Sequence, residues 1–314
     1  MRQATSRNFF NYSRNGTHVG IYSTWFILIV MCLQCQTDTV DHDKAYIASD
    51  YQYYSTTLYR TVAYSVVMPS NLNEQKIKGR RYPVLYLLHC AGCDNRSFIE
   101  GYNLMDSINK FDMIIVIPYD GTGGGWWLDS PIDTLSQLST WLKGEFKNHI
   151  DSAFPTYTNR SNTGVAGHSM GGFGALHNLA LHPEIFGAAF SAKGLLDMVG
   201  NKGNYMANSV LGSFLTYPQN YHNVDILENA KRFLHINAPV KFYSGPNDWF
   251  QDENLSFDSL LTLYNVPHTY FENNEDHFSM SSGSMHNMLA WFDSLFTRSQ
   301  SSTFTTGTSS EKKE

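Results

Sequence analysis

The stretch Gly167-His-Ser-Met-Gly171 decides the fold of this chain. It places a serine between two glycines, after a segment of small residues and before residues 173–181, whose apolar side chains recur at helical spacing. A strand, a sharp turn and a helix in this order are typical of a nucleophile elbow, in which the turn exposes the serine Oγ. Because glycine has no Cβ, Gly167 and Gly171 let strand and helix approach closely. The pattern therefore predicts that Ser169 is an exposed nucleophile.

The composition indicates a packed α/β protein and not a nucleic-acid-binding one. The chain has 314 residues, of which 42% are hydrophobic and 14% aromatic, enough for one large domain or two small ones. Its 22 Lys and Arg against 28 Asp and Glu give a formal net charge of -6. Binding to phosphates requires clustered basic residues, and the sequence has no such cluster. A nucleic-acid partner is therefore not expected.

Residues 1–35 have the layout of an export signal. Three arginines and no acidic residue precede an apolar run from about Val19 to Leu33. The run is short for a comfortable membrane span, and an Ala-x-Ala type of cleavage site is not evident. We therefore expect residues 1–35 to be an export signal or a membrane anchor, which would place the protein in the periplasm or outside the cell.

Cys32 and Cys35, at the end of the apolar run, raise the alternative of a lipid-attached cysteine as in bacterial lipoproteins. Gln34 is a poor fit to the small residue expected before such a cysteine. The polar residues 36–50 then form a linker, and the Ser- and Thr-rich residues 299–314 a disordered tail. Neither segment can bury enough apolar surface to offset the entropy of ordering.

Residues 51–298 are expected to form one domain in which strands alternate with helices. Apolar runs such as 84–88 and 113–117 are typical of central strands buried on both faces of a sheet. The expected strands are 59–68, 84–89, 113–118, 163–167, 186–191, 240–244 and 269–272, and the expected helices are 132–150, 170–181, 255–264 and 282–296. This alternation predicts a mostly parallel sheet covered by helices on both faces, with functional residues beyond the carboxyl ends of the strands.

Ser169 needs a base, for which His277 is the expected residue. A nucleophile elbow takes its base from a histidine late in the chain, with an acid between the two in the order Ser, Asp, His. His277 follows the last expected strand and precedes the last expected helix. Among the alternatives, His268 begins a strand, His286 lies inside a helix and His182 ends a helix, where histidine commonly has a structural role.

Asp248 is the expected acid, which would hold the tautomer of the imidazole and stabilise the imidazolium. It follows directly after an expected strand, in the sequence Gly-Pro-Asn-Asp. Its rivals are Asp252, Asp258 and Asp276. Asp252 lies at an expected helix start, where a carboxylate is favourable for the helix itself. Asp276 adjoins His277, and neighbouring side chains usually diverge.

An oxyanion hole is the third requirement, because negative charge develops on the substrate when the serine attacks. One N–H should come from Met170, the residue after the nucleophile. The other should come from the loop after the strand at 84–89, where Ala91 is the candidate. No metal and no cofactor are expected in such a site.

Together these pieces resemble the esterase D family of α/β-hydrolases, which includes S-formylglutathione hydrolases, feruloyl and acetylxylan esterases, short-chain tributyrin-type esterases and mycolyltransferases. The resemblance covers about residues 55–296 and implies the α/β-hydrolase fold with a triad of Ser169, Asp248 and His277. It runs through Tyr82-Pro-Val-Leu-Tyr-Leu-Leu-His, Ile115-Val-Ile-Pro, Gly124-Gly-Trp-Trp-Leu-Asp-Ser-Pro, Gly167-His-Ser-Met-Gly-Gly-Phe-Gly-Ala, the Gly-x-x-Asp of Gly245 to Asp248, and His277.

The oxyanion loop departs from the pattern of this family. Members typically carry glycine where this chain has Cys90, whereas Cys93 resembles a cysteine that S-formylglutathione hydrolases carry in this loop. The two cysteines could form a disulfide in an exported protein, or a redox pair. Two buried thiols are the favoured interpretation.

The function favoured by these expectations is that of a serine carboxylesterase acting through an acyl-enzyme on carbohydrate-linked or short-acyl esters. Trp126, Trp127 and Trp249 are expected to border the pocket, where their flat faces would stack on sugar rings or on an aromatic acyl group. The alternatives are an S-formylglutathione-type thioester hydrolase, which an export signal disfavours, an acyltransferase, and a non-enzymatic binding protein that kept the fold. The sequence does not indicate an oligomeric state.

Overall fold

The computed structural model describes residues 46–202 and 206–307, and side chains up to residue 299. All of these belong to one compact unit. The expected export signal or anchor, the two cysteines at its end and most of the expected linker lie outside the described residues. Within the described ranges, no helix combines the length and the apolar character that crossing a bilayer requires.

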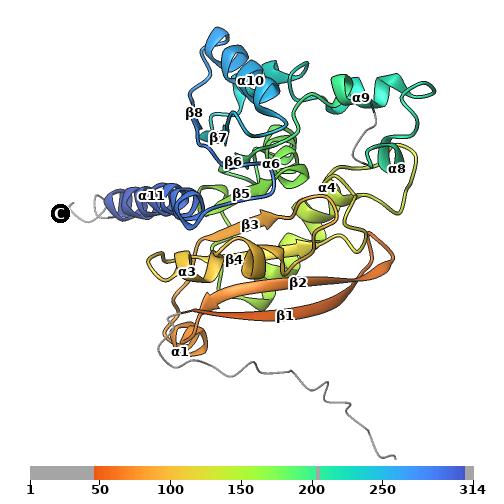
Figure 1. Ribbon diagram of the computed structural model, residues 1–314. Helices are drawn as coiled ribbons and strands as arrows, with labels where there is room; N and C mark the ends of the chain where they lie inside the picture. The colour runs from red at the N-terminus through yellow and green to blue at the C-terminus, as the bar shows by residue number, and fades with distance from the viewer. Residues whose placement is uncertain (1–45, 203–205, 308–314) are drawn as a thin grey trace, which may run out of the picture. The chain divides into compact units, whose positions relative to one another are not determined.

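An eight-stranded, mostly parallel sheet organises the domain (Figure 1). The strands are β1 (Tyr46–Ser55), β2 (Arg60–Pro69), β3 (Val84–Leu88), β4 (Ile114–Tyr119), β5 (Thr163–His168), β6 (Ala188–Ala192), β7 (Val240–Ser244) and β8 (His268–Glu272). Their order across the sheet is β1-β2-β4-β3-β5-β6-β7-β8. The pairs β1–β2 and β2–β4 are antiparallel, and every other pair is parallel.

The register of the parallel strands brings their carboxyl ends together. Gly167 of β5 pairs with Leu88 of β3, and His168 pairs with Ala192 of β6. On the next pair, Ala192 is opposite Tyr243 of β7. The loops that leave β3, β5, β6 and β7 therefore start beside one another, as functional loops do in open parallel sheets.

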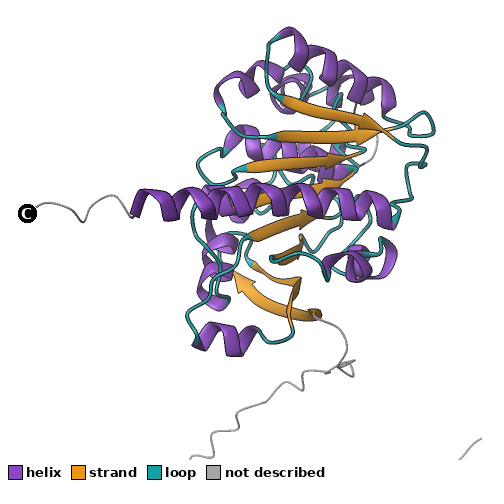
Figure 2. Cartoon of the chain, turned by 90° about the vertical axis from the view of Figure 1, so that its left-hand side faces the viewer, coloured by secondary structure: helices purple, strands orange, loops and turns teal. Residues whose placement is uncertain are grey.

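Helices cover both faces of the sheet, and Figure 2 shows the long C-terminal helix lying across one of them. The α-helices are α1 (Leu72–Ile77), α2 (Ser97–Gly101), α3 (Leu104–Ile108), α4 (Leu138–Trp141), α5 (Lys147–Ala153), α6 (Met170–Leu181), α7 (Met198–Asn201), α8 (Asn208–Leu211), α9 (Pro218–Val224), α10 (Gln251–Leu263) and α11 (Ser282–Gly307). A π-helical turn, η1 (Leu142–Phe146), joins α4 to α5, and two 3-10 turns are η2 (Arg160–Asn162) and η3 (Ala230–His235).

Two hydrophobic cores form, one on each face of the sheet. Val84, Tyr86 and Leu88 of β3 point into the core that contains residues of α6 and α10, whereas Leu85 and Leu87 point into the core beneath α3 and α11. Successive side chains of a strand face opposite sides, so a strand buried on both faces must be apolar throughout. This is the physical reason for the continuous apolar runs in the sequence.

Several element boundaries differ from those expected, and three of the differences are large. Strand β1 begins at Tyr46, inside the expected linker 36–50, because ten of its residues pair antiparallel with β2. The expected helix 132–150 begins only at Leu138 and contains the π-helical turn. Helix α11 continues to Gly307, past the expected domain end at residue 298 and into the expected tail, of which residues 308–314 lie outside the described part.

Candidate active site

Ser169 occupies a sharp turn between β5 and α6. Its backbone has φ 56° and ψ -117°, a left-handed conformation that is costly for a residue with a side chain and is typical of functional turns. A Cβ on Gly171 would lie 1.9 Å from the carbonyl oxygen of Leu88, and one on Gly167 would lie 2.3 Å from the carbonyl carbon of Gly171. Both positions therefore require glycine, and the strand, turn and helix have the arrangement of the expected elbow.

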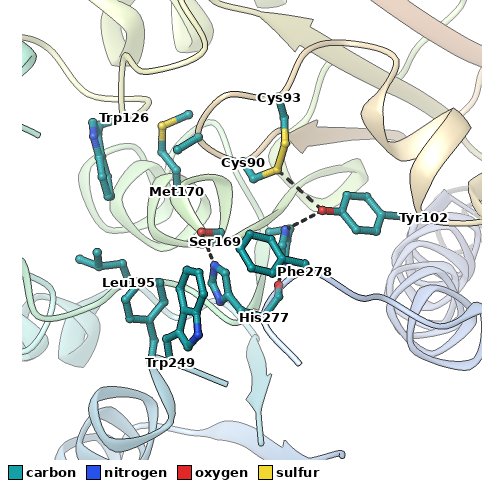
Figure 3. Close-up of a pocket in the computed structure, with 13 residues that line it drawn as sticks. Cys90, Cys93, Tyr102, Trp126, Ser169, Met170, Leu195, Trp249, His277 and Phe278 are labelled. Atoms are coloured by element: carbon teal, nitrogen blue, oxygen red, sulfur yellow. Dashed lines mark hydrogen bonds between the residues drawn. A yellow bond between two sulfur atoms is a disulfide. The ribbon is translucent and has the colours of Figure 1, made fainter. Parts of the chain in front are cut away.

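The structure brings Ser169, His277 and Asp248 into one line of contacts. Nε2 of His277 lies 2.9 Å from Oγ of Ser169, and Nδ1 lies 3.3 Å from Oδ2 of Asp248. Since the Asp248 carboxylate accepts a hydrogen bond from Nδ1–H, Nε2 carries a lone pair that can accept the hydroxyl proton of Ser169. Figure 3 shows the imidazole of His277 facing the side chain of Ser169. His277 and Asp248 are both buried, at 5% and 7% exposure.

Two of the three rival acids contact other groups, and the third lies at the start of a helix. Asp252 lies in the first turn of α10, and Oδ1 of Asp258 contacts Nε2 of His268 at 2.9 Å. The carboxylate of Asp276 accepts hydrogen bonds from the backbone N–H groups of Phe278 and Ser279. Asp248 is thus the acid that the fold directs at His277.

His168 and Tyr102 are site residues that the sequence analysis missed. Nε2 of His168 donates to the carbonyl oxygen of His277 at 2.7 Å, and its Nδ1 lies 3.3 Å from the Tyr102 hydroxyl. Burial, together with the charges of His277 and Lys193, lowers the pKa of His168 to about 3, so its ring is neutral near pH 7. His168 lies inside the quoted glycine-serine stretch, but no sequence signal shows that its side chain turns toward a loop more than a hundred residues later.

Met170 and Ala91, the residues expected to form an oxyanion hole, both lie beside Ser169 in the cavity wall. Met170 is the first residue of α6, so its N–H has no partner within the helix. Ala91 lies in a turn in which the N–H of Cys93 donates to the carbonyl oxygen of Cys90 at 3.1 Å, with Gly92 at φ 73° as a type II turn demands. Both residues line the same pocket as Ser169.

The favoured interpretation of Cys90 and Cys93 as two buried thiols is wrong. The two cysteines form a disulfide whose Cα atoms are 5.2 Å apart. It joins the first and last residues of the turn that carries Ala91 (Figure 3). The turn itself brings the two side chains to bonding distance, because the first and fourth residues of a β-turn lie close together.

A largely apolar cavity of about 230 Å³ opens above Ser169. It is lined by Cys90, Ala91, Cys93, Tyr102, Trp126, His168, Ser169, Met170, Leu195, Trp249, Phe250, His277 and Phe278. Trp249 is 57% exposed and stacks on the His277 ring with centroids 4.8 Å apart. Phe278 is 67% exposed and meets Trp249 edge-on, so two aromatic side chains form the rim. Trp126 and Trp249 therefore border the cavity as expected.

Trp127 does not border the cavity, contrary to expectation. Its side chain is fully buried, and its Nε1 donates to the carbonyl oxygen of His89 at 3.1 Å. A Cβ on Gly174 of α6 would lie 2.5 Å from the Trp127 side chain. Trp127 thus packs between α6 and His89, which directly follows β3.

Asp120 organises the glycine-rich loop that carries Trp126 and was not anticipated from the sequence. Its buried carboxylate accepts hydrogen bonds from the backbone N–H groups of Thr122, Gly123 and Gly125. Burial raises the pKa of this carboxyl, but the nearby His89 and the three N–H groups outweigh it, so the net shift is downward. The signal is an aspartate at the end of β4 followed by glycines, which is typical of a loop folded around a carboxylate.

The fold and the arrangement of these side chains define an α/β-hydrolase. The model of the Esterase family, described as "Putative esterase", matches residues 55–299, and the chain belongs to this family. A curated relative, Esterase Rv1288 of Mycobacterium tuberculosis (strain ATCC 25618 / H37Rv), is 34% identical over 135 residues, which are 41% of this chain and 28% of that protein. The match thus spans less than a third of that relative.

Solved structures share the fold at low identity. A ferulic acid esterase superposes with a TM-score of 0.66 at 21% identity, covering 80% of this chain and 99% of that one. An S-formylglutathione hydrolase from Agrobacterium tumefaciens superposes with a TM-score of 0.65 at 17% identity, covering 80% and 96%. At these identities the likeness concerns the fold.

Proposed function

We propose that this protein is a serine carboxylesterase that works through an acyl-enzyme. One observation carries the proposal: hydrogen-bonding contacts run without interruption from Oγ of Ser169 through the His277 ring to the Asp248 carboxylate. Membership of the Esterase family supports the same reaction class. If His277 did not contact Ser169 and Asp248 in this way, the site would support a binding function but not catalysis.

The roles of the residues follow from this geometry. His277 takes the hydroxyl proton as Ser169 attacks the ester carbonyl carbon, and Asp248 stabilises the resulting imidazolium. The N–H groups of Ala91 and Met170 stabilise the negative oxygen of the tetrahedral intermediate. His277 then returns the proton to the leaving alcohol. Water, activated by the same histidine, attacks the acyl-enzyme and releases the acid.

The lining of the cavity favours esters with an uncharged acyl group. None of the thirteen described lining residues is Lys, Arg, Asp or Glu. The carboxylates of a glutathione thioester would find no cation there, which disfavours the thioester alternative. The rim residues Trp249 and Phe278 offer flat faces for a sugar ring or an aromatic acid. We therefore favour acetyl or feruloyl esters of carbohydrates.

Activity on a substrate panel tests this function. The purified protein is assayed on p-nitrophenyl acetate, a feruloyl sugar ester, acetylated xylan and S-formylglutathione, with Ser169→Ala as the matched control. We expect sugar esters to have a higher kcat/KM than S-formylglutathione, and Ser169→Ala to lose on the order of 10⁶ in kcat while keeping its Tm. Retained turnover in Ser169→Ala would contradict the mechanism.

Product analysis separates hydrolysis from acyl transfer, since both use the same acyl-enzyme. With a sugar alcohol present at high concentration, a hydrolase releases mainly the free acid. Release of mainly the new ester would identify an acyltransferase instead.

We further propose that the protein is exported and retained near the membrane by residues 1–35. The Cys90–Cys93 disulfide supports this location, because disulfides persist in oxidising compartments. Cell fractionation with an antibody against the domain tests it. Full-length protein with an intact N-terminus in the cytosolic fraction would contradict both export and tethering.

A further inference from the structure

Lys193 is a fully buried lysine beside the proposed site that the ester-hydrolysis mechanism does not use. It directly follows β6, and its side chain has no exposed surface. Its backbone is in the left-handed region at φ 53°, a conformation that costs energy for a residue with a side chain. A buried ammonium group is also costly unless it is paired. Two unfavourable features at one residue suggest a functional constraint.

The ammonium group of Lys193 is fully satisfied by the loop that carries His277. It donates to the carbonyl oxygens of Asp276 and Ser279, both at 2.6 Å, and to Oε2 of Glu275 at 3.1 Å. An ammonium group has three N–H donors and no acceptor, so these three contacts use its whole capacity. No donor remains for a substrate.

These contacts bracket His277. The loop between β8 and α11 has neither helix nor strand at His277, so no regular hydrogen-bond ladder holds its backbone. Lys193 holds the carbonyl group directly before His277 and the one two residues after it. The side-chain position of the histidine relative to Ser169 therefore depends on where the ammonium group sits.

The backbone of residues 192 and 193 also contacts the segment that carries Ser169. The carbonyl oxygen of Ala192 accepts the N–H of Ser169 at 2.9 Å, and the next residue is Lys193. The N–H of Lys193 in turn donates to the carbonyl oxygen of Tyr243 at 2.8 Å, on the strand that leads to Asp248. Residues 192 and 193 thus contact the segments that carry all three aligned side chains.

Glu275 extends this contact to the last helix. Its Oε1 accepts the N–H of Ser281 at 2.9 Å and the hydroxyl of Ser284 at 2.7 Å. Burial raises the pKa of Glu275, but hydrogen bonds from Ser281 and Ser284 and the charge of Lys193 lower it to about 2, so the carboxylate is ionised. The loop is therefore fixed at one end by Lys193 and at the other by the start of α11.

We propose that Lys193 is a positioning residue for the esterase reaction, which holds the His277 loop so that the imidazole stays aligned between Ser169 and Asp248. It acts through the backbone of residues 276 and 279 and does not touch the substrate. This inference rests on the proposed function and deepens it.

The test compares Lys193→Met with Lys147→Met. Lys147 is a second buried lysine, at the start of α5. Its ammonium group pairs with the carboxylate of Asp151, also on α5, and with the carbonyl oxygen of Thr158. None of these three residues lines the cavity above Ser169. Both variants remove a buried ammonium group that contacts a carboxylate and backbone carbonyl oxygen, two carbonyl groups for Lys193 and one for Lys147, so both should lower Tm. The measurements are kcat and KM for p-nitrophenyl acetate, the pH profile of kcat/KM, and Tm.

We expect Lys193→Met to lower kcat by roughly 10²-fold, because a misplacement of about 1 Å in a catalytic group has that effect. Its KM should stay within about twofold, and the acid limb of its pH profile should shift, because contact of His277 with Asp248 is loosened. Lys147→Met should keep the wild-type kcat and pH profile. Equal kcat and pH profiles in the two variants would overturn the inference and leave a purely structural lysine.

A second variant covers the case in which Lys193→Met does not fold. Glu275→Gln keeps the side-chain size and one acceptor but removes the charge that Lys193 pairs with. We expect it to lower kcat with KM retained, and a wild-type kcat and pH profile would again overturn the inference. If Ser169→Ala is inactive while these variants behave as wild type, only this inference fails. If Ser169→Ala stays active, the proposed function itself fails.

Discussion

Nε2 of His168 lies 2.7 Å from the carbonyl oxygen of His277, so the residue next to the proposed nucleophile holds the backbone of the proposed base. The two residues are 109 positions apart in the chain. Together with Lys193, which donates to the carbonyl groups of Asp276 and Ser279, this contact fixes an otherwise irregular loop. Alignment of the site thus depends on buried side chains beyond those of Ser169, His277 and Asp248.

The choice of acid is tested by Asp248→Asn. The amide keeps the shape of the side chain but favours the wrong tautomer of His277, so we expect kcat to fall by about 10⁴-fold with little change in Tm. Asp276→Asn is the matched control, because the Asp276 carboxylate accepts hydrogen bonds from the backbone N–H groups of Phe278 and Ser279 in the same loop. A crippled Asp276→Asn beside a mild Asp248→Asn would show that the acid is misassigned.

Opening the Cys90–Cys93 disulfide should affect catalysis more than stability. The ring spans only four residues, so its loss returns little chain entropy to the unfolded state. It holds the turn that carries the Ala91 N–H, and loss of one oxyanion donor costs about 10²–10³ in kcat. We expect a mild reductant, or the Cys90→Ser/Cys93→Ser variant, to lower kcat by roughly tenfold, since the donor is loosened and not removed.

The redox state is followed by thiol labelling and mass spectrometry in the same samples. The double serine variant should not respond further to reductant. If the reduced wild-type protein keeps its full kcat, the disulfide has no part in holding the oxyanion loop.

Trp249 and Trp127 should respond differently to truncation. Trp249 lies on the rim, so Trp249→Ala should raise KM for a feruloyl sugar ester more than for p-nitrophenyl acetate. Trp127 is fully buried against α6, so Trp127→Ala should lower stability by about 3–5 kcal/mol, as measured by urea unfolding. An unchanged ratio of the two KM values in Trp249→Ala would remove this residue from the substrate site.

Buried histidines should make the protein less stable in acid. Burial, and to a smaller extent nearby positive charge, lowers the pKa of His177 to about 3 from the ordinary 6.5. Between these pH values the unfolded state binds a proton that the folded state excludes, so stability decreases as pH falls through this window. His177→Phe keeps the ring beside Phe173, where the two rings stack at 5.3 Å. It should reduce the slope by up to about 1.4 kcal/mol per pH unit.

Glu253 should contribute a pH dependence of stability with the opposite sign. Burial raises its pKa to about 7 from 4.5, so the folded state gains a proton first and stability increases as pH falls between these values. Glu253→Gln should therefore steepen the decrease in stability as pH falls, whereas His177→Phe should make this decrease shallower. Urea unfolding at several pH values measures both slopes, and equal slopes in wild type and His177→Phe would contradict the assignment.

The sequence alone determined the elements whose physics is local. Continuous apolar runs such as 84–88 can be satisfied only by strands buried on both faces, and the Gly167–Gly171 spacing is required because a Cβ at either end would collide with backbone. Chain order and position after a strand end were enough to select Ser169, Asp248 and His277 for a shared site, since parallel strands bring their carboxyl ends to one edge.

The tertiary structure determined the side-chain contacts that the sequence pattern does not encode. The direction of the Trp127 side chain, the pairing of Cys90 with Cys93, and the contacts of His168 and Lys193 with the His277 loop leave no periodic pattern in the sequence. The same residue types would be equally compatible with a rim tryptophan, free thiols or a surface lysine. A side chain's partner is set by how strands pack and loops close, and all of these contacts except the Cys90–Cys93 disulfide join residues at least 38 positions apart in the chain.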